Sequence, residues 1–266
     1  MIQHKFLKDE LVPMHILPKI CSTDEIVGSV SRANFGLPIN AKLLASCGDL
    51  QCTVYPFIEP ETAVLNLGTS AQLCFLPTIN DADYASLLME PFFIGKKIVV
   101  AASMNGGNAI NLIAEKVVEW ASQLISGTTA LKIDYEKLYG ILNEPEKCLP
   151  STVTVKPVFI SERVNNVLSC ISGINSSTTV EELLHRTACG VISNLFRLLP
   201  PYQLRKWGIK RIILVGNANE YYFKGEIIRH CQGFLDVSPS MNKCLECCRY
   251  SAAYGAALHA LCFYGF

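Results

Sequence analysis

Residues 47–76 read CGDLQCTVYPFIEPETAVLNLGTSAQLCFL, and this stretch decides the fold. An apolar run from Ala63 to Leu67 stops at Gly68-Thr69-Ser70, and a second apolar run follows from Leu73 to Leu76. Two short apolar runs joined by a tight, glycine-containing turn predict a β-hairpin. We therefore expect two neighbouring antiparallel strands here.

The turn and a carboxylate upstream of it have the chemistry of a phosphate site. Backbone N–H groups and hydroxyls at a turn such as Gly68-Thr69-Ser70 suit an anion, especially a phosphate chain. Asp49, directly after Gly48, could accept a proton from a hydroxyl group that attacks the phosphate. The hypothesis is phosphoryl transfer. The plainer alternative is that both segments are ordinary turns, in which Gly, Asp and Ser are common.

Composition narrows the class of protein. The chain has 266 residues, 50% hydrophobic and 17% charged, so it can bury a sizeable core. Lys plus Arg and Asp plus Glu both number 23, which does not favour a nucleic-acid or acidic-membrane partner. No apolar run reaches the ~20 residues of a membrane helix, and charges fill the first ten residues in place of a secretory leader. We expect a cytoplasmic protein with no membrane partner.

The 12 cysteines raise the alternatives of a disulfide framework or a metal site. Most are scattered, several inside apolar runs, which favours free thiols in a reducing compartment. Cys244, Cys247 and Cys248 form the tight cluster. A zinc site is not favoured there, because no second C-x-x-C or H-x-x-x-H motif supplies the remaining ligands.

Two strand ends downstream of the hairpin carry small and polar residues. The apolar run Ile98 to Ser103 stops at Met104-Asn105-Gly106-Gly107-Asn108, and the run Arg211 to Val215 ends at Gly216-Asn217-Ala218-Asn219. Ligands of α/β sheets bind beyond the carboxyl ends of strands. We therefore expect both corners to border a ligand site.

The order of the remaining elements predicts an α/β domain with a mixed sheet flanked by helices. Apolar residues at helical spacing indicate helices over residues 107–125, 134–142, 179–199, 222–231 and 250–263. Further strands are expected at residues 26–30, 43–47, 152–160 and 234–237, the second of these buried.

In this order the motifs resemble the C-terminal half of an FGGY carbohydrate kinase. The resemblance runs from about Leu17 to Ala260 and is carried by six segments: GDLQ (48–51), VLNLGTSAQL (64–73), ASMNGGN (102–108), SER (161–163), RTACGVISNL (186–195) and AAYGAAL (252–258). It implies an actin-like, ribonuclease H-like ATPase domain, one of two that close over ATP, Mg²⁺ and a sugar. By the same resemblance Asp49 is the catalytic base that deprotonates the terminal hydroxyl of a ketose, and Gly68, Thr69 and Ser70 bind the ATP phosphates.

The resemblance also implies a nucleotide side. Gly216 and Asn217 match the family's adenosine motif, and Gly106 and Gly107 line the nucleotide side of the cleft. The family usually has two or three glycines in the adenosine motif, whereas this sequence has Gly216 followed by Tyr221-Tyr222. The tyrosines either narrow the adenine site or stack on the base.

The family's N-terminal domain has no counterpart in this sequence. Residues 1–20 are interpreted as a linker from that domain, and residues 21–266 as the ATP-side domain. Because the absent domain contributes a phosphate loop, Mg²⁺ contacts and sugar contacts, no metal ligand is assigned to this chain. We expect the chain alone to be inactive, or nearly so.

Other interpretations remain open. The chain could be a catalytically inactive remnant that binds nucleotide or a partner protein, or a thiol or metal protein built on its cysteines. Glu162-Arg163 is interpreted either as a surface ion pair or as a substrate-side pair.

Overall fold

The computed structural model describes residues 17–22, 24–33, 36–78, 87–125, 131–144, 151–162, 168–240 and 251–264. The chain divides into two compact units, Met1–Gly48 and Asp49–Phe266. In the first unit, β1 (Ile26–Ser29) pairs antiparallel with β2 (Lys42–Leu44). The predicted linker at residues 1–20 lies almost wholly outside the described residues and stays a prediction.

The prediction of a buried strand at residues 43–47 is wrong. The strand ends at Leu44, and the residues of β2 are exposed or half-buried. The physical reason is that β2 pairs with β1 in a small sheet of its own and takes no part in the large sheet of the second unit.

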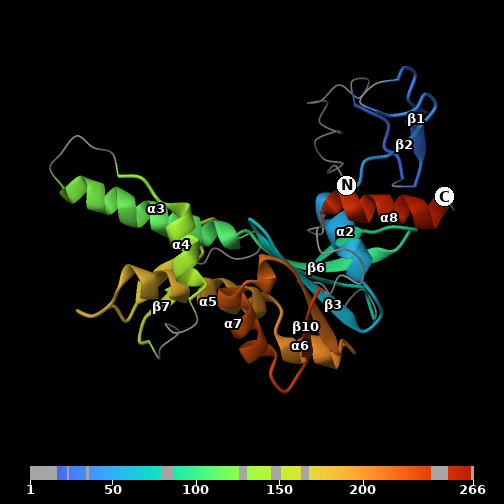
Figure 1. The fold of residues 1–266 in the computed structure, drawn as a ribbon. Helices are drawn as coiled ribbons and strands as arrows, with labels where there is room; N and C mark the ends of the chain where they lie inside the picture. Colours follow the sequence, from blue (N-terminus) through green and yellow to red (C-terminus); the bar gives the residue numbers. More distant parts are fainter. Residues whose placement is uncertain are drawn as a thin grey trace, which may run out of the picture. The chain divides into compact units, whose positions relative to one another are not determined.

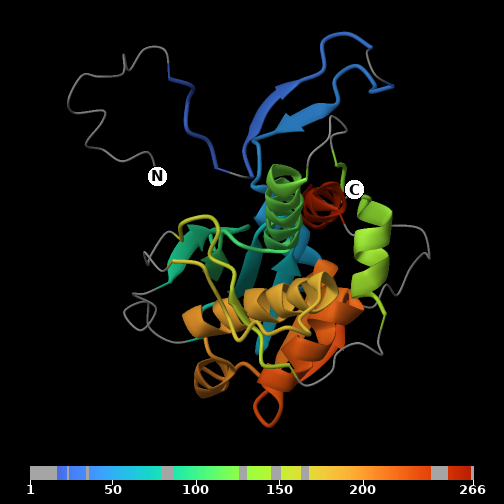
Figure 2. The same ribbon diagram turned by 90° about the vertical axis from the view of Figure 1, so that its left-hand side faces the viewer.

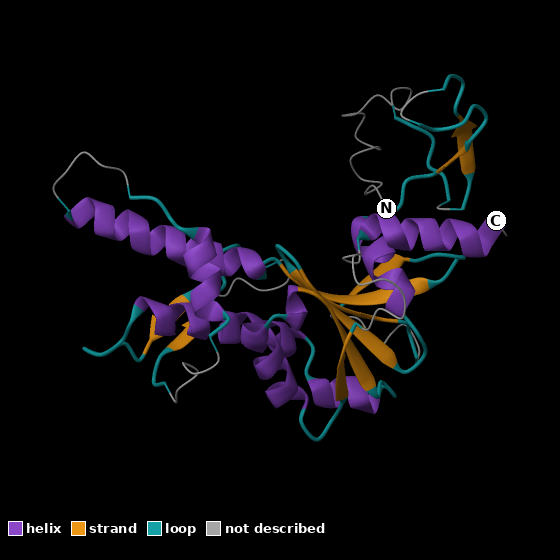
Figure 3. Ribbon diagram, in the orientation of Figure 1, coloured by secondary structure: helices purple, strands orange, loops and turns teal. Residues whose placement is uncertain are grey.

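The second unit contains a mixed six-stranded sheet in the order β10-β9-β3-β4-β6-β5 (Figures 1 and 3). β10, β9 and β3 run parallel, whereas β4 and β6 are each antiparallel to their neighbours. The bounds are β3 (Thr62–Leu67), β4 (Ala71–Phe75), β5 (Leu88–Pro91), β6 (Lys97–Ser103), β9 (Arg211–Gly216) and β10 (Asp236–Pro239). The predicted hairpin is confirmed as β3 and β4, joined by the turn at residues 68–70.

The register of the sheet brings three strand ends together. Leu67 pairs with Ala71 across the hairpin and with Gly216 on the parallel strand β9. Ala71 in turn pairs with Ser103, the last residue of β6. The hairpin turn, the end of β6 and the end of β9 therefore lie along one edge of the sheet.

Helices flank the sheet, which confirms the predicted fold class. They are α2 (Asp49–Val54), α3 (Gly107–Leu124), α4 (Tyr135–Leu142), α5 (Val180–Leu198), α6 (Pro201–Lys206), α7 (Tyr221–Cys231) and α8 (Ala252–Tyr264), with 3₁₀ turns η2 (Tyr55–Phe57) and η5 (Asn217–Asn219). In Figure 1, α2 and α8 lie on the opposite side of the sheet from α5 and α7. None of the helices among the described residues is long and apolar enough to span a membrane.

Both faces of the central strands are buried, as a sheet between helix layers requires. Ala63, Leu65 and Leu67 point into the main core with residues of α3, α5 and α7. Val64, on the opposite face because successive side chains of a strand alternate, is also fully buried. The continuous apolar character of residues 63–67 follows from this double burial.

Helix α5 has the signals that the sequence predicted. The side chain of Thr179 accepts a hydrogen bond from the Glu182 N–H at the N-cap, and Pro200 and Pro201 follow its end. Figure 2 shows the molecule turned by 90° from the view of Figure 1.

Two predicted strands are shorter or shifted. β7 (Thr154–Lys156) pairs with β8 (Cys170–Ser172) and stops before Pro157, which lacks the N–H that a strand ladder needs. The predicted strand at residues 234–237 begins two residues later, because the N–H groups of Phe234 and Leu235 both donate to the Cys231 carbonyl at the end of α7.

Candidate functional site

The hairpin turn docks directly on the N-terminus of α3. The N–H of Gly107 donates to the Gly68 carbonyl at 2.9 Å, and the N–H of Asn108 donates to the Thr69 carbonyl at 3.3 Å. The first N–H groups of a helix have no partner within the helix, so the turn satisfies them. Turn and helix end thus form one corner of the site.

Two glycines allow this close packing. A Cβ atom at Gly106 would lie 2.4 Å from the Ser70 carbonyl carbon and 2.6 Å from its oxygen, so no side chain fits between α3 and the turn. Gly216 has a φ of +65°, a conformation that side chains disfavour, and a Cβ there would lie 2.7 Å from the Leu67 carbonyl oxygen. The backbones of three strand ends therefore touch where the sequence has glycine.

The structure brings three of the predicted site segments together. Besides the contacts of residues 68–70 with Gly106 and Gly107, the side-chain amide of Asn217 lies beside Gly107, 3.5 Å from the position of a Cβ there. Thr69, Gly216 and Asn217 are exposed, so the edge is open to a ligand. The glycine-rich strand end and the hydroxyl-bearing turn have the chemistry of a phosphate site.

Asp49 occupies a different setting. It is the exposed first residue of α2, and its Oδ1 accepts a hydrogen bond from the Leu50 N–H at 2.8 Å. A carboxylate at a helix N-terminus is also a common stabilising feature. The contacts that join the three loop segments do not involve Asp49, and its role as a base stays a prediction.

The two tyrosines after the adenosine-like motif differ in setting. Tyr222 is buried and packs against Phe223, with ring centroids 4.6 Å apart. Tyr221 has 49% of its surface exposed. Of the pair, Tyr221 is therefore the more accessible residue.

A buried carboxylate that sequence reasoning misjudged supports the corner. Glu162 Oε1 accepts hydrogen bonds from Ser103 Oγ (2.6 Å), Asn105 Nδ2 (3.0 Å) and Asn194 Nδ2 (2.8 Å). Its Oε2 accepts from the Met104 N–H at 2.9 Å. Glu162 thereby ties the end of β6 to α5.

Asn105 carries this support to the neighbouring segment. Its Nδ2 donates to the Ile160 carbonyl at 2.7 Å, and its Oδ1 accepts from the Ile160 N–H at 2.9 Å. Asn105 is completely buried, so its exchange of hydrogen bonds with a backbone segment fixes the chain directly before Gly106.

The hydrogen bonds keep Glu162 ionised. Burial by itself raises the pKa of a carboxyl group, but the donors from Ser103, Met104, Asn105 and Asn194 outweigh it and lower the pKa of Glu162 below its usual value. The interpretation of Glu162 as a surface residue is wrong, since only 7% of it is exposed, and Arg163 lies outside the described residues. In the sequence, Ser103 and Asn105 indicated polar groups at the end of this strand. Nothing indicated that Glu162 is the acceptor they share.

The described residues include most of the cysteines that raised the metal and disulfide alternatives. They contain no group of three or more His, Cys, Asp or Glu side chains that could hold a metal ion. No disulfide joins the described cysteines to one another; these are Cys21, Cys47, Cys52, Cys74, Cys170, Cys189, Cys231 and Cys262. The cluster at Cys244, Cys247 and Cys248 lies outside the described residues.

Comparison with known proteins finds relatives of one kind. Over 222 residues the chain is 29% identical to the sedoheptulokinase of Homo sapiens, covering 80% of this chain and 45% of that protein. Over 216 residues it is 30% identical to the sedoheptulokinase of Mus musculus, covering 77% of this chain and 44% of that protein. The chain thus spans about half the length of the curated relatives it matches. No family model matches it.

Solved structures share the fold. The xylulose kinase of Rhodospirillum rubrum superposes with a TM-score of 0.67 at 16% identity, over 98% of this chain and 51% of that one. A glycerol kinase of Plasmodium falciparum, solved with ADP, gives a TM-score of 0.62 at 16% identity, over 98% of this chain and 50% of that one. The resemblance to carbohydrate kinases and the actin-like fold expected from the sequence are confirmed.

Proposed function

We propose that this chain, a homologue of sedoheptulokinases with the fold of the sugar kinases, is the nucleotide-binding half of an ATP-dependent carbohydrate kinase. The observation that carries the proposal is the meeting of residues 68–70, Gly106-Gly107 and Gly216-Asn217 at one open edge of the sheet. Three backbone segments in contact, two of them held by glycines, form a surface that a phosphate chain can approach closely.

Within this proposal each segment has a task. The Thr69 and Ser70 hydroxyls would contact the ATP phosphates from the hairpin turn, and the exposed Gly216 and Asn217 would face the nucleoside. Glu162 has no contact with ligand in this scheme and holds the corner in place. The arrangement supplies positioning and hydrogen-bond donors, which are the main requirements of phosphoryl transfer.

Asp49 would act as the general base. Its carboxylate would accept the proton of a sugar hydroxyl while the hydroxyl oxygen forms a bond to the γ-phosphorus and the bond to the bridging oxygen of ADP breaks. Mg²⁺ would accompany ATP and neutralise charge on its phosphates. Among the described residues, no group of three or more His, Cys, Asp or Glu side chains could hold that ion.

The proposed sugar is a ketose, sedoheptulose, phosphorylated on its terminal hydroxyl to sedoheptulose 7-phosphate. This assignment rests on the names of the two relatives. We further propose that this chain of 266 residues needs the other half of the kinase, supplied as an N-terminal domain, to hold the sugar.

Binding and turnover test the two parts of the proposal separately. Titration of the purified chain with ATP and Mg²⁺ should show saturable binding, and its absence would rule out a nucleotide-binding half. An ADP-release assay with ATP, Mg²⁺ and sedoheptulose should show no ketose-dependent turnover by the chain alone. Ketose-dependent turnover would overturn the need for a second domain.

The alternative function is a remnant that binds nucleotide without catalysis. The observation that favours this alternative is the setting of Asp49, whose carboxylate accepts the Leu50 N–H at 2.8 Å at the start of α2, as a helix-capping carboxylate does. A chain completed with its N-terminal domain that binds ATP but phosphorylates no ketose would favour the remnant over the kinase.

A further inference from the structure

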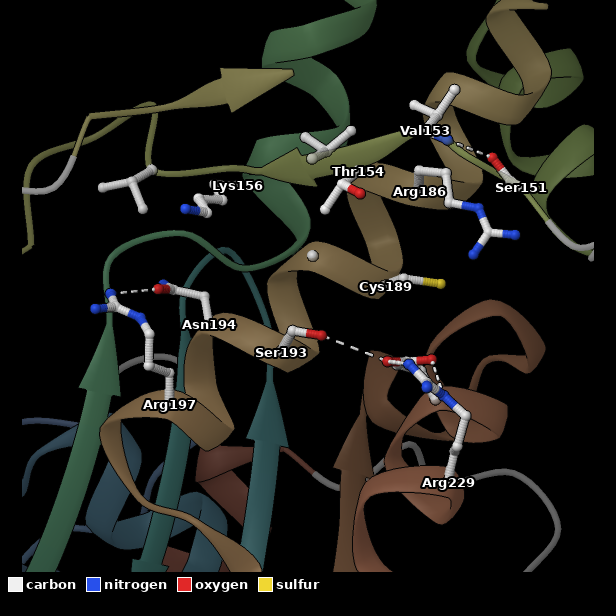
Figure 4. A pocket seen from close by; sticks show the side chains of 14 residues that line it. Ser151, Val153, Thr154, Lys156, Arg186, Cys189, Ser193, Asn194, Arg197 and Arg229 are labelled. Atoms are coloured by element: carbon white, nitrogen blue, oxygen red, sulfur yellow. Dashed lines mark hydrogen bonds and ion pairs between the residues drawn. The ribbon is translucent and has the colours of Figure 1, made fainter. Parts of the chain in front are cut away.

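We call the meeting of residues 68–70, 106–107 and 216–217 the loop edge. A polar pocket that shares none of these residues lies between α5, α7 and β7 (Figure 4). On α5 it is lined by Arg186, Cys189, Gly190, Ser193, Asn194 and Arg197. Their spacing of three and four residues places them on one face of the helix. The cavity has a volume of about 370 Å³, within the range of small-molecule sites.

Cationic side chains from three elements line this pocket. Lys156 comes from β7, Arg186 and Arg197 from α5, and Arg229 from α7. Figure 4 shows Lys156 and Arg197 on one side of α5 and Arg186 and Arg229 on the other. Against these four cations the lining has one carboxylate, Glu226, which leaves an excess of three positive charges.

The single carboxylate is already neutralised by the protein. Glu226 accepts a hydrogen bond from Arg229 Nε at 2.9 Å, and the Nε2 atom of His230 lies 3.0 Å from its Oε1. Burial would raise the pKa of Glu226, but hydrogen bonds from His230 and Arg229 outweigh it and bring that pKa to about 2. Glu226 therefore remains ionised, and besides its α7 neighbours it accepts a hydrogen bond from Ser193 Oγ of α5 at 3.4 Å.

Among the described residues, two of the other cations have no carboxylate partner. Arg197 donates to the neutral Asn194 Oδ1 at 2.9 Å, and Lys156 forms no ion pair with any described residue. Both side chains belong to exposed residues. Guanidinium and ammonium groups that face one cavity without a carboxylate partner favour an added anion.

Asn194 gives the floor of the pocket a fixed geometry. It donates to the buried Glu162 Oε1 at 2.8 Å and to Ser103 Oγ at 3.2 Å while its oxygen accepts from Arg197. The Arg197 guanidinium is thus held by a group that is itself anchored in the core. Because the Arg197 side chain is already partly ordered, less of its conformational entropy is lost when a ligand binds.

We propose that this pocket binds a compact phosphate ester, in which the phosphate contacts Lys156 and Arg197 and a small polar body lies over α5. Thr154 offers a hydroxyl to such a body, and Val155 and Val158 give the cavity an apolar wall. The pocket is lined by none of the residues of the loop edge, so the proposal is independent of the kinase assignment.

Calorimetric titration with glycerol 2-phosphate tests the proposal, with uncharged glycerol as the matched ligand. At constant ionic strength the full chain should bind glycerol 2-phosphate saturably and glycerol not at all. The K156Q/R197Q double variant should bind at least tenfold more weakly, because it removes the two cations without a carboxylate partner. The R197Q single variant should fall between the two.

A control that removes one positive charge, as R197Q does, separates the pocket from general electrostatics. Lys116 is exposed on α3 and paired with Glu119, so K116Q should leave the affinity within twofold of the wild type. The T69A variant separates the pocket from the loop edge and should also leave the affinity within twofold. Circular dichroism of the double variant should match the wild type, since both substituted residues are exposed.

Three results would overturn the proposal: no saturable binding of glycerol 2-phosphate, equal weakening by K116Q and the double variant, or loss of binding in T69A with retention in K156Q/R197Q. The last result would place the anion at the loop edge.

Discussion

Replacing Glu162 by glutamine tests whether a buried, ionised carboxylate holds the corner of the loop edge. The carboxylate accepts four hydrogen bonds, three on Oε1 and one on Oε2, and the glutamine amide can accept at one oxygen only. With its oxygen at the Oε1 position, E162Q presents an NH₂ group to the Met104 N–H. That N–H loses its acceptor, and the other three bonds lose their charge assistance.

The structure sets the size of the effect. A hydrogen bond to a charged group contributes about 1.5–3 kcal/mol, and a buried donor left without an acceptor costs about 1–3 kcal/mol. We expect E162Q to lower the free energy of unfolding by about 2–4 kcal/mol, near the upper range of single substitutions. Only 7% of Glu162 is exposed, so water does little to compensate.

Urea denaturation monitored by circular dichroism measures this loss. E119Q is the matched control, because Glu119 forms an exposed ion pair with Lys116 and such pairs contribute about 0–1 kcal/mol to the free energy of unfolding. The pKa of Glu162 is lowered in the folded state, so its stabilisation is present above the ordinary carboxyl pKa and is lost as pH falls through the folded value. The E162Q penalty should therefore shrink in acid. A penalty equal to that of E119Q, or one independent of pH, would refute the reasoning.

Three further outcomes are expected. Alanine at Gly106 places a Cβ 2.4 Å from the Ser70 backbone, so ATP affinity should fall at least tenfold in a titration, whereas alanine at the uncrowded, helical Gly140 should not change it. In the chain completed with its N-terminal domain, D49N should remove ketose phosphorylation by several orders of magnitude while ATP still binds, and near-normal turnover would exclude Asp49 as the base. The folded pKa of Glu226 is about 2, below its ordinary value of 4.5, so its contribution to the free energy of unfolding should be present above pH 4.5 and decline as pH falls toward 2. If the free energy of unfolding of E226Q parallels that of the wild type over this pH range, the prediction is contradicted.

Local patterns predicted the framework well because the periodicity of apolar residues reports burial directly. The β3–β4 hairpin and α5 followed from apolar runs and from Thr179 and Pro200 at the helix ends. The prediction of a buried strand at residues 43–47 failed because an apolar run does not say which sheet it will join, and β2 lies in a small sheet of two strands.

The glycines of the site could be located in sequence, but their contacts could not. Gly106 and Gly216 stand 110 positions apart, and only the registers of β9 with β3, β3 with β4 and β4 with β6 place their turns together. Glu162 is a sharper case. Nothing local to Ser161-Glu162-Arg163 indicates burial, since the four donors come from β6, the corner after it and α5.

Hydrogen exchange of the 266-residue chain with and without MgATP tests the central claim most directly, that three strand ends form one phosphate site. ATP should slow exchange together in residues 66–72, 104–110 and 214–220, and should leave exchange in residues 88–98, on β5 and the start of β6, unchanged. Protection confined to the α5–α7–β7 pocket, or no protection at saturating ATP, would contradict it.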